Sequence, residues 1–397
     1  MRYTLLTLGL IIVLLVALAC EPRGNGGPKA SGDTGPIIIG YYGDLSGRTS
    51  NFGQSTKNGA LMAVDEINKS GGVGGRQIQL LVEDDQGRPE QAATVVTKFI
   101  NQDRVHALLG EVASGNTLAA APKAQAARIP MVTPSSTADS VTQVGDYIFR
   151  VCYTDSFQGE AMARFAANTL KARRAAILLD FNSPYSRGLT QVFKDNFTRL
   201  GGEIVTEQSY TQGDRDYKGQ LTSIRPAGAD VIFIPGYYGE VGVIAKQAKE
   251  LGIDKPLLGT DGWDAPQLFE LGGSALNGSY MSNHYSVDDP APAIQKFIAA
   301  YRAHYNGATP DALAALGYDA MNVLADAIRR AGTTDGPRLR DAIAHTVNFA
   351  GVTGTISINA ERNAIKPIVV LKLENGRYVY QETIQPSSVA GGTAALH

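Results

Sequence analysis

Short apolar runs alternate along the chain with longer stretches in which apolar residues return every three or four positions. The apolar runs cover residues 37–42, 78–82, 105–109, 175–179, 203–207 and 231–234. Between two of them, apolar residues stand at positions 92, 95, 96, 99 and 100, which is the spacing of one helix face. Regular alternation of strand and helix predicts parallel sheets covered by helices on both faces. We therefore expect an α/β fold.

The alternation pauses near residues 150–158 and then starts again, which predicts two lobes of similar build. Two successive helices follow later, one with apolar residues at 294, 297, 298, 301 and 305 and an alanine-rich one over 311–330. Strand-like runs over 354–358, 368–373 and 378–383 come next. This order indicates that the chain crosses between the lobes more than once.

The first twenty residues differ from the rest. A positive start at Arg2 precedes an apolar run over 5–19, which predicts an export signal and is shorter than the roughly 20 residues that a transmembrane helix needs. The residues before Cys20 resemble a bacterial lipobox, with Ala17 where leucine is usual. The resemblance implies a signal peptide over 1–19 and a lipid on Cys20, with cleavage and secretion as the alternative. Residues 20–35, rich in Gly and Pro, are expected to form a flexible tether.

Composition narrows the possible partners. The 397 residues are 44% hydrophobic, enough to bury sizeable cores, and 36 Lys and Arg are balanced by 38 Asp and Glu. Without a basic field we expect no nucleic-acid partner. Cys152 is the only cysteine besides Cys20, so we expect no intrachain disulfide and interpret Cys152 as a small buried residue rather than a reactive thiol.

The sequence motifs give little support for an enzyme. A hydrolase elbow around Ser114 would need glycines where Val112 and Asn116 stand, and the five histidines are scattered without metal-ligand spacing. The glycine-rich stretch 70–77 lacks the GK[ST] ending of a phosphate loop and is interpreted as a helix cap and turn. We expect a chain that is not an enzyme and binds no cofactor or metal.

Two hydroxyl-rich stretches in the first lobe favour an anion site. "LLGEVASGNT" over 108–117 and "IPMVTPSST" over 129–137 each end an apolar run with small polar residues. Such residues cap helices, and the same free N–H groups bind anions. Neither stretch contains Lys or Arg, so a small carboxylate would be held by neutral dipoles and hydroxyls.

The second lobe offers an acidic and aromatic counterpart. Tyr237 and Tyr238 follow one buried run, and Asp261 and Trp263 follow another. A carboxylate suits an ammonium group, and aromatic rings beside it exclude water. An amino acid carries both charges, although turn chemistry and ordinary packing also explain these residues individually.

In order along residues 36–385, these stretches resemble the Leu/Ile/Val-binding protein family of bacterial branched-chain amino acid ABC transporters. "YSRGL", "GYYGEVGVIAKQAKELG" and "LLGTDGW" complete the set. The resemblance implies a type I periplasmic-binding-protein fold with three crossovers, near 151–155, 281–285 and 349–354. The lobes would then comprise 36–152 with 284–350 and 153–283 with 351–385, followed by a tail over 386–397.

The resemblance also implies roles for single residues. Ser114 and Thr137 would bind the ligand carboxylate, and the Ser135 carbonyl would accept from the ammonium group. Asp261 stands where the family has a glutamate that pairs with the ammonium group, and it is one methylene shorter. Phe52, Tyr185 and Tyr237 match aromatic residues that line the family's pocket. We also expect Ala113, Ser136 and Trp263 to line the pocket.

The function implied is extracytoplasmic binding of an amino acid, branched-chain or otherwise hydrophobic, with hinge closure and delivery to the membrane permease of an ABC importer. The chain would be a monomer held at the cell envelope, in the periplasm or on the outer face of the cytoplasmic membrane, by its lipid anchor. A sensing module of the same fold, specific for an amide, an aromatic acid or an amino acid, is the alternative.

Overall fold

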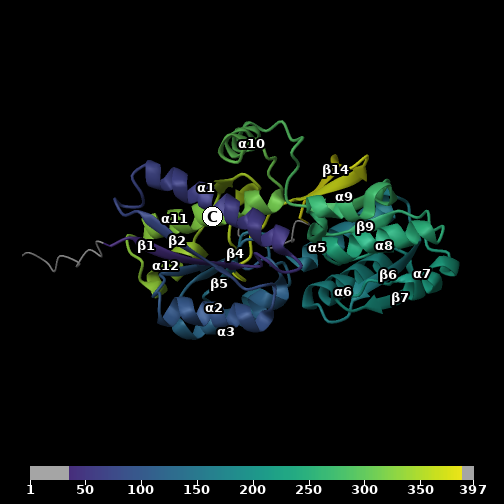
Figure 1. Cartoon of the computed structure of the whole chain (residues 1–397), viewed down its shortest axis with the longest axis horizontal. Helices are drawn as coiled ribbons and strands as arrows, with labels where there is room; N and C mark the ends of the chain where they lie inside the picture. Colours follow the sequence, from purple (N-terminus) through teal and green to yellow (C-terminus); the bar gives the residue numbers. More distant parts are fainter. Residues whose placement is uncertain (1–34, 387–397) are drawn as a thin grey trace, which may run out of the picture. The chain divides into compact units, whose positions relative to one another are not determined.

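Strand β1 (Ile37–Gly43) shows how the sequence builds the first sheet. Ile37, Ile39 and Tyr41 pack in one apolar cluster with α1 (Ser50–Lys69) and α11 (Ala312–Ala331), which lie side by side (Figure 1). Tyr42 and the partly buried Ile38 pack in another cluster, with α2 (Pro89–Asn101) and α3 (Ser114–Ala127). Both faces of the strand are therefore covered, as the alternation of strand and helix predicts.

The computed structural model describes residues 35–386. The predicted signal peptide, Cys20, nearly all of the predicted tether and the tail after 386 lie outside the described residues. None of the helices between 35 and 386 combines the length and apolar composition needed to cross a membrane.

The first sheet is entirely parallel, in the order β2-β1-β3-β4-β5. Its other strands are β2 (Ile78–Asp84), β3 (Ala107–Leu109), β4 (Met131–Thr133) and β5 (Ile148–Arg150). The short helix α4 (Ser140–Gln143) connects β4 to β5, and α10 (Pro292–His304) and α12 (Gly336–Ala344) pack against α1 and α11.

The second sheet has the order β14-β13-β10-β9-β8-β6-β7 and is mainly parallel. Its strands are β6 (Arg174–Asp180), β7 (Glu203–Tyr210), β8 (Val231–Phe233), β9 (Leu257–Gly259), β10 (Ser279–Asn283), β13 (Ile368–Glu374) and β14 (Arg377–Ile384). The antiparallel pairings of β13 with β10 and β14 place the end of the chain at one edge.

Helices cover both faces of the second sheet. Ile177 and Leu179 of β6 pack in the cluster that includes α5 (Asp155–Arg164) and α6 (Pro184–Arg199). Ala176 and Leu178 pack in the cluster that includes α7 (Lys218–Ile224), α8 (Tyr238–Glu250) and α9 (Pro266–Gly272). The predicted fold class, with two mainly parallel sheets flanked by helices, is confirmed.

The chain passes between the sheets after β5, after β10 and before β13. The hairpin of β11 (Phe349–Gly351) and β12 (Gly354–Ile356) precedes the last passage. The Arg150 N–H donates to the Arg362 carbonyl at 3.2 Å, and Arg362 Nη2 donates to the Thr142 carbonyl at 2.8 Å. Because these bonds hold residues near 362 beside the first sheet, we propose that the third crossover follows them, later than the expected 349–354.

Removing one buried ring should test the core of the second lobe. Phe193 stacks on Phe197 and Phe233 at centroid distances of 5.4 and 4.1 Å. We expect Phe193→Ala to lower the free energy of unfolding by about 3–5 kcal/mol, measured by urea denaturation. The same substitution at Phe181, which is 62% exposed, should change it by less than about 0.5 kcal/mol. Equal losses in the two variants would contradict this core assignment.

Candidate functional site

The candidate site lies beyond the carboxyl ends of strands from both sheets, where open parallel sheets bind their ligands. A small cavity there has about 230 Å³ of space unoccupied by atoms, a volume that includes open solvent at its mouth. Its lining residues are Phe52, Val112, Ser135, Tyr185, Tyr237, Asp261, Gly262 and Leu313. Five of these were predicted from the sequence, and Val112, Gly262 and Leu313 were not.

On the first lobe, a hydrogen bond joins the two hydroxyl-rich stretches. Ser114 is the first residue of α3, and its Oγ accepts from the Ala138 N–H at 3.2 Å. Its own hydroxyl hydrogen remains a potential donor. Thr137 is fully buried, and its Oγ1 forms no hydrogen bond of normal geometry in the part of the chain that the structure describes. Its hydroxyl lies near the Asp155 carboxyl, where it opposes the burial that raises the pKa of Asp155. Both hydroxyls are buried, but neither Ser114 nor Thr137 is among the residues that line the cavity, whereas Ser135 is.

Ser136 and Ala113, which are also predicted for the pocket, are not among the residues that line this cavity, and their polar groups form hydrogen bonds within the chain. The Ser136 hydroxyl lies 2.7 Å from the Glu111 carbonyl and 2.5 Å from Thr117 Oγ1. The Ala113 carbonyl accepts from the N–H groups of Asn116 and Thr117, both at 3.1 Å. Their polar groups are thus engaged in joining the end of β3 to the start of α3.

On the second lobe, Asp261 presents a buried carboxylate. Tyr185 Oη donates to Asp261 Oδ1 at 2.6 Å, and His284 Nε2 lies 3.2 Å from Asp261 Oδ2. The Asp261 N–H donates to Gln158 Oε1 at 3.0 Å, which fixes the backbone of the turn. Asp261 is 5% exposed and lines the cavity. A carboxylate oxygen accepts more than one hydrogen bond, so both oxygens can still accept from a ligand.

His284 was missed by the sequence analysis, which grouped it with scattered histidines. Burial lowers the pKa of His284 to about 4, although the Asp261 carboxylate acts in the opposite direction. The imidazole is therefore neutral at pH 7, and donation to Asp261 requires the tautomer protonated at Nε2. The ring stacks on Tyr153 at 3.9 Å between centroids. No motif signals this contact, because it joins residues 23 positions apart from different segments.

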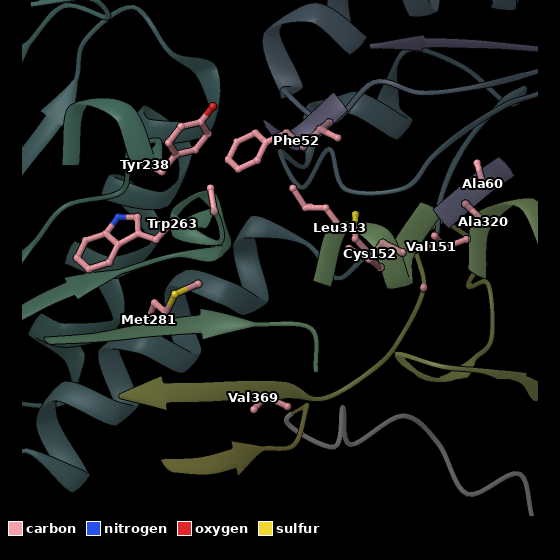
Figure 2. Packing of buried hydrophobic residues seen from close by; sticks show 14 of the residues in the cluster. Phe52, Ala60, Val151, Cys152, Tyr238, Trp263, Met281, Leu313, Ala320 and Val369 are labelled. Atoms are coloured by element: carbon pink, nitrogen blue, oxygen red, sulfur yellow. The ribbon is translucent and has the colours of Figure 1, made fainter. Parts of the chain in front are cut away.

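Aromatic rings close the cavity from both lobes. Phe52 of α1 packs edge-on against Tyr237 at 5.7 Å and against Tyr238 at 5.0 Å (Figure 2). Tyr185 stacks on Tyr237 at 5.2 Å. The two sides are also joined by hydrogen bonds, because Asn51 Nδ2 donates to Tyr238 Oη at 3.1 Å. The predicted positions of Phe52, Tyr185 and Tyr237 thus come together.

Trp263, which is predicted for the pocket, lies in the core and is not among the residues that line the cavity. Its indole points away from Phe52 (Figure 2), is fully buried, and donates from Nε1 to the Ile234 carbonyl at 3.1 Å. The ring packs directly over Gly259, where a Cβ would lie only 2.1 Å from it. Asp261 and Trp263 share one short 3₁₀ turn after β9, in which Asp261 lines the cavity while the Trp263 ring packs on Gly259 of β9.

The described residues contain no arrangement of three or more His, Cys, Asp and Glu that could hold a metal ion. Cys152 is fully buried, as predicted, and burial raises the pKa of its thiol to about 12. Such a thiol is not activated for nucleophilic attack.

Comparison with known proteins identifies the family. The pattern of the periplasmic binding protein family matches residues 36–377. The chain belongs to this family. The Leu/Ile/Val-binding protein homolog 3 of Brucella melitensis is 30% identical over 307 residues, which cover 77% of this chain and 82% of the relative. The resemblance to the Leu/Ile/Val-binding proteins is therefore confirmed, and the family is one of binding proteins rather than enzymes.

Solved structures agree with this periplasmic binding protein over most of its length. A leucine-binding protein from Thermotoga maritima has a TM-score of 0.85 at 38% identity, covering 88% of this chain and 99% of that one. A branched-chain amino acid substrate-binding protein from Streptococcus pneumoniae, solved with isoleucine, has a TM-score of 0.84 at 33% identity, covering 88% and 100%. A solute-binding protein from Rhodopseudomonas palustris, solved with 3,4-dihydroxybenzoic acid, has a TM-score of 0.79 at 26% identity, covering 90% and 99%.

The burial of His284 should make stability depend on pH. The pKa of His284 is about 4 in the folded protein and about 6.5 when unperturbed, so the unfolded chain binds the extra proton between these values. The contribution of the neutral His284 side chain to the free energy of unfolding is complete above pH 6.5. This contribution is lost as the pH falls toward 4, and the loss amounts to roughly 3 kcal/mol at most.

Urea denaturation of the wild type and of His284→Gln, between pH 7.5 and 4.5, measures this effect. The variant should gain stability relative to the wild type as pH falls, while the exposed His345→Gln should follow the wild type. Parallel pH profiles for the wild type and His284→Gln would contradict the assignment.

Proposed function

We propose that this periplasmic binding protein is the substrate-binding component of an ABC importer for a hydrophobic, branched-chain amino acid. One observation carries the proposal: the buried carboxylate of Asp261 lines the same cavity as Ser135, which belongs to the hydroxyl-rich stretch over 129–137. A zwitterion satisfies both sides at once, because its ammonium group pairs with Asp261 while its carboxylate accepts from the hydroxyl-rich loop.

The rest of the lining favours an apolar side chain. Val112, Leu313 and the rings of Phe52 and Tyr237 contribute mostly hydrocarbon surface to the cavity. The leucine and isoleucine named for two related structures have such side chains. The shorter Asp261 places its carboxylate nearer the second lobe than a glutamate would, so the ammonium group lies nearer that lobe or is reached through water.

Closure of the lobes over the ligand supplies the affinity. A ligand of about nine heavy atoms gains at most about 13 kcal/mol even at the best efficiency, and micromolar binding needs about 8 kcal/mol. Such efficiency requires almost complete burial. The contacts of Phe52 with Tyr237 and Tyr238, and the hydrogen bond from Asn51 to Tyr238, are available only when the lobes meet. We expect the permease to recognise this closed form.

Replacing the charge of Asp261 tests the ammonium assignment. We expect Asp261→Asn to weaken leucine binding by about tenfold or more, since it removes a charge-assisted hydrogen bond, as measured by isothermal titration calorimetry. Asp254→Asn is the matched control, because Asp254 is exposed and pairs only with Lys249 among the salt bridges of the described chain.

Leucine, isoleucine, valine and 3,4-dihydroxybenzoate serve as ligands in this titration. Unchanged affinity for the amino acids in Asp261→Asn would contradict the ammonium assignment. Binding of the aromatic acid alone would contradict the amino acid class while leaving a substrate-binding role.

We also propose that Cys20 carries the lipid that anchors the protein to the cell envelope. Cells grown with radioactive palmitate should label the wild type and Cys152→Ala, and should not label Cys20→Ala, because Cys152 is buried in the folded protein. Label retained in Cys20→Ala, or absent from the wild type, would contradict the anchor and favour secretion.

A further inference from the structure

The buried guanidinium of Arg150 contacts residues 136–138, the loop around Thr137 that we assign to the ligand carboxylate and call the carboxylate loop. Arg150 ends β5 and is fully buried. Its Nη1 donates to the Ser136 carbonyl and its Nη2 to the Ala138 carbonyl, both at 2.8 Å. These two carbonyls flank Thr137 in the chain, so one guanidinium grips the loop on both sides of that residue.

This cation lacks a direct counter-ion. Within the described chain no carboxylate forms a salt bridge with Arg150, and its Nε has no hydrogen-bond partner. Asp155 and Asp139 are close enough for their charges to oppose the effect of burial on the pKa of Arg150, which is nonetheless lowered. An unpaired buried charge costs several kcal/mol, which polar neighbours reduce only in part.

The geometry of the peptide group relates Arg150 to the site. In a trans peptide the C=O and the following N–H point to opposite sides. Because the Ser136 carbonyl faces the guanidinium, the Thr137 N–H points away from it. Hydrogen bonding to a cation polarises the peptide and makes that N–H a stronger donor to an anion.

We propose that Arg150 is a positioning residue that fixes the carboxylate loop and supplies the positive charge that neither hydroxyl-rich stretch contains. The inference rests on the proposed function, because it assigns this loop to a ligand carboxylate. A bound carboxylate on the opposite side of the Ser136–Thr137 peptide then adds a negative charge to those of Asp139 and Asp155, neither of which forms a salt bridge with Arg150.

The experiment compares a ligand that has a carboxylate with one that does not. Affinities for leucine and for leucinol, in which a hydroxymethyl group replaces the carboxylate, are measured by calorimetry for the wild type and Arg150→Met. We expect the wild type to prefer leucine, and this preference to fall by about tenfold in Arg150→Met. Arg199→Met is the matched control, since Arg199 is exposed on α6 and bonds to Asn196.

Arg150→Lys keeps the positive charge but lacks the two Nη groups that donate to the two carbonyls. Its preference for leucine over leucinol should therefore lie between those of the wild type and Arg150→Met. It also provides the test if Arg150→Met does not fold, which circular dichroism and thermal melting would reveal. Equal weakening of leucine and leucinol, with the preference retained, would show a purely structural role and overturn the proposal. A wild type that binds leucinol as tightly as leucine would instead contradict the carboxylate assignment within the proposed function.

Discussion

The burial of charge between two lobes is the constraint on which the site depends. Asp261 is nearly inaccessible. The role that we propose for it requires its carboxylate to remain available to a ligand, so the charge has to be stabilised by neutral donors. Tyr185 from α6 and His284 from the segment after β10 provide these donors at 2.6 and 3.2 Å. Both partners are neutral at pH 7, since burial raises the pKa of Tyr185 and lowers the pKa of His284. The negative charge is therefore held in place without being cancelled.

The two halves of the site use different chemistry for different charges. The first lobe relies on backbone groups and hydroxyls, which are fixed by Ser136 on one side and by Arg150 on the other. The second lobe relies on one charged side chain and a wall of rings. This division suits a zwitterion, because a rigid set of dipoles binds a carboxylate at little cost in reorganisation, whereas an ammonium group needs a full negative charge.

His284 connects the Asp261 carboxylate to the crossover between the lobes. It directly follows β10, where the chain leaves the second sheet, and it contacts the carboxylate at the end of β9. A change in the path of this crossover therefore moves a hydrogen-bond partner of Asp261. The contacts of Phe52 with Tyr237 and Tyr238 also depend on the arrangement of the lobes, since they form only where the lobes meet.

The sequence by itself determined the fold class, because strand and helix periodicities are local and their alternation admits few topologies. It also predicted Phe52, Ser135, Tyr185, Tyr237 and Asp261 for the site, since each follows a recognisable strand end or matches a family motif, and these five residues line one cavity. Only the tertiary structure decided the partners of these residues. His284 and Arg150 carry no local signal, and Trp263 carried a misleading one, because its position next to Asp261 in the chain says nothing about which side of the sheet end its ring occupies. Side-chain direction after a tight turn and contacts between distant segments are set by packing, which no short stretch of sequence encodes.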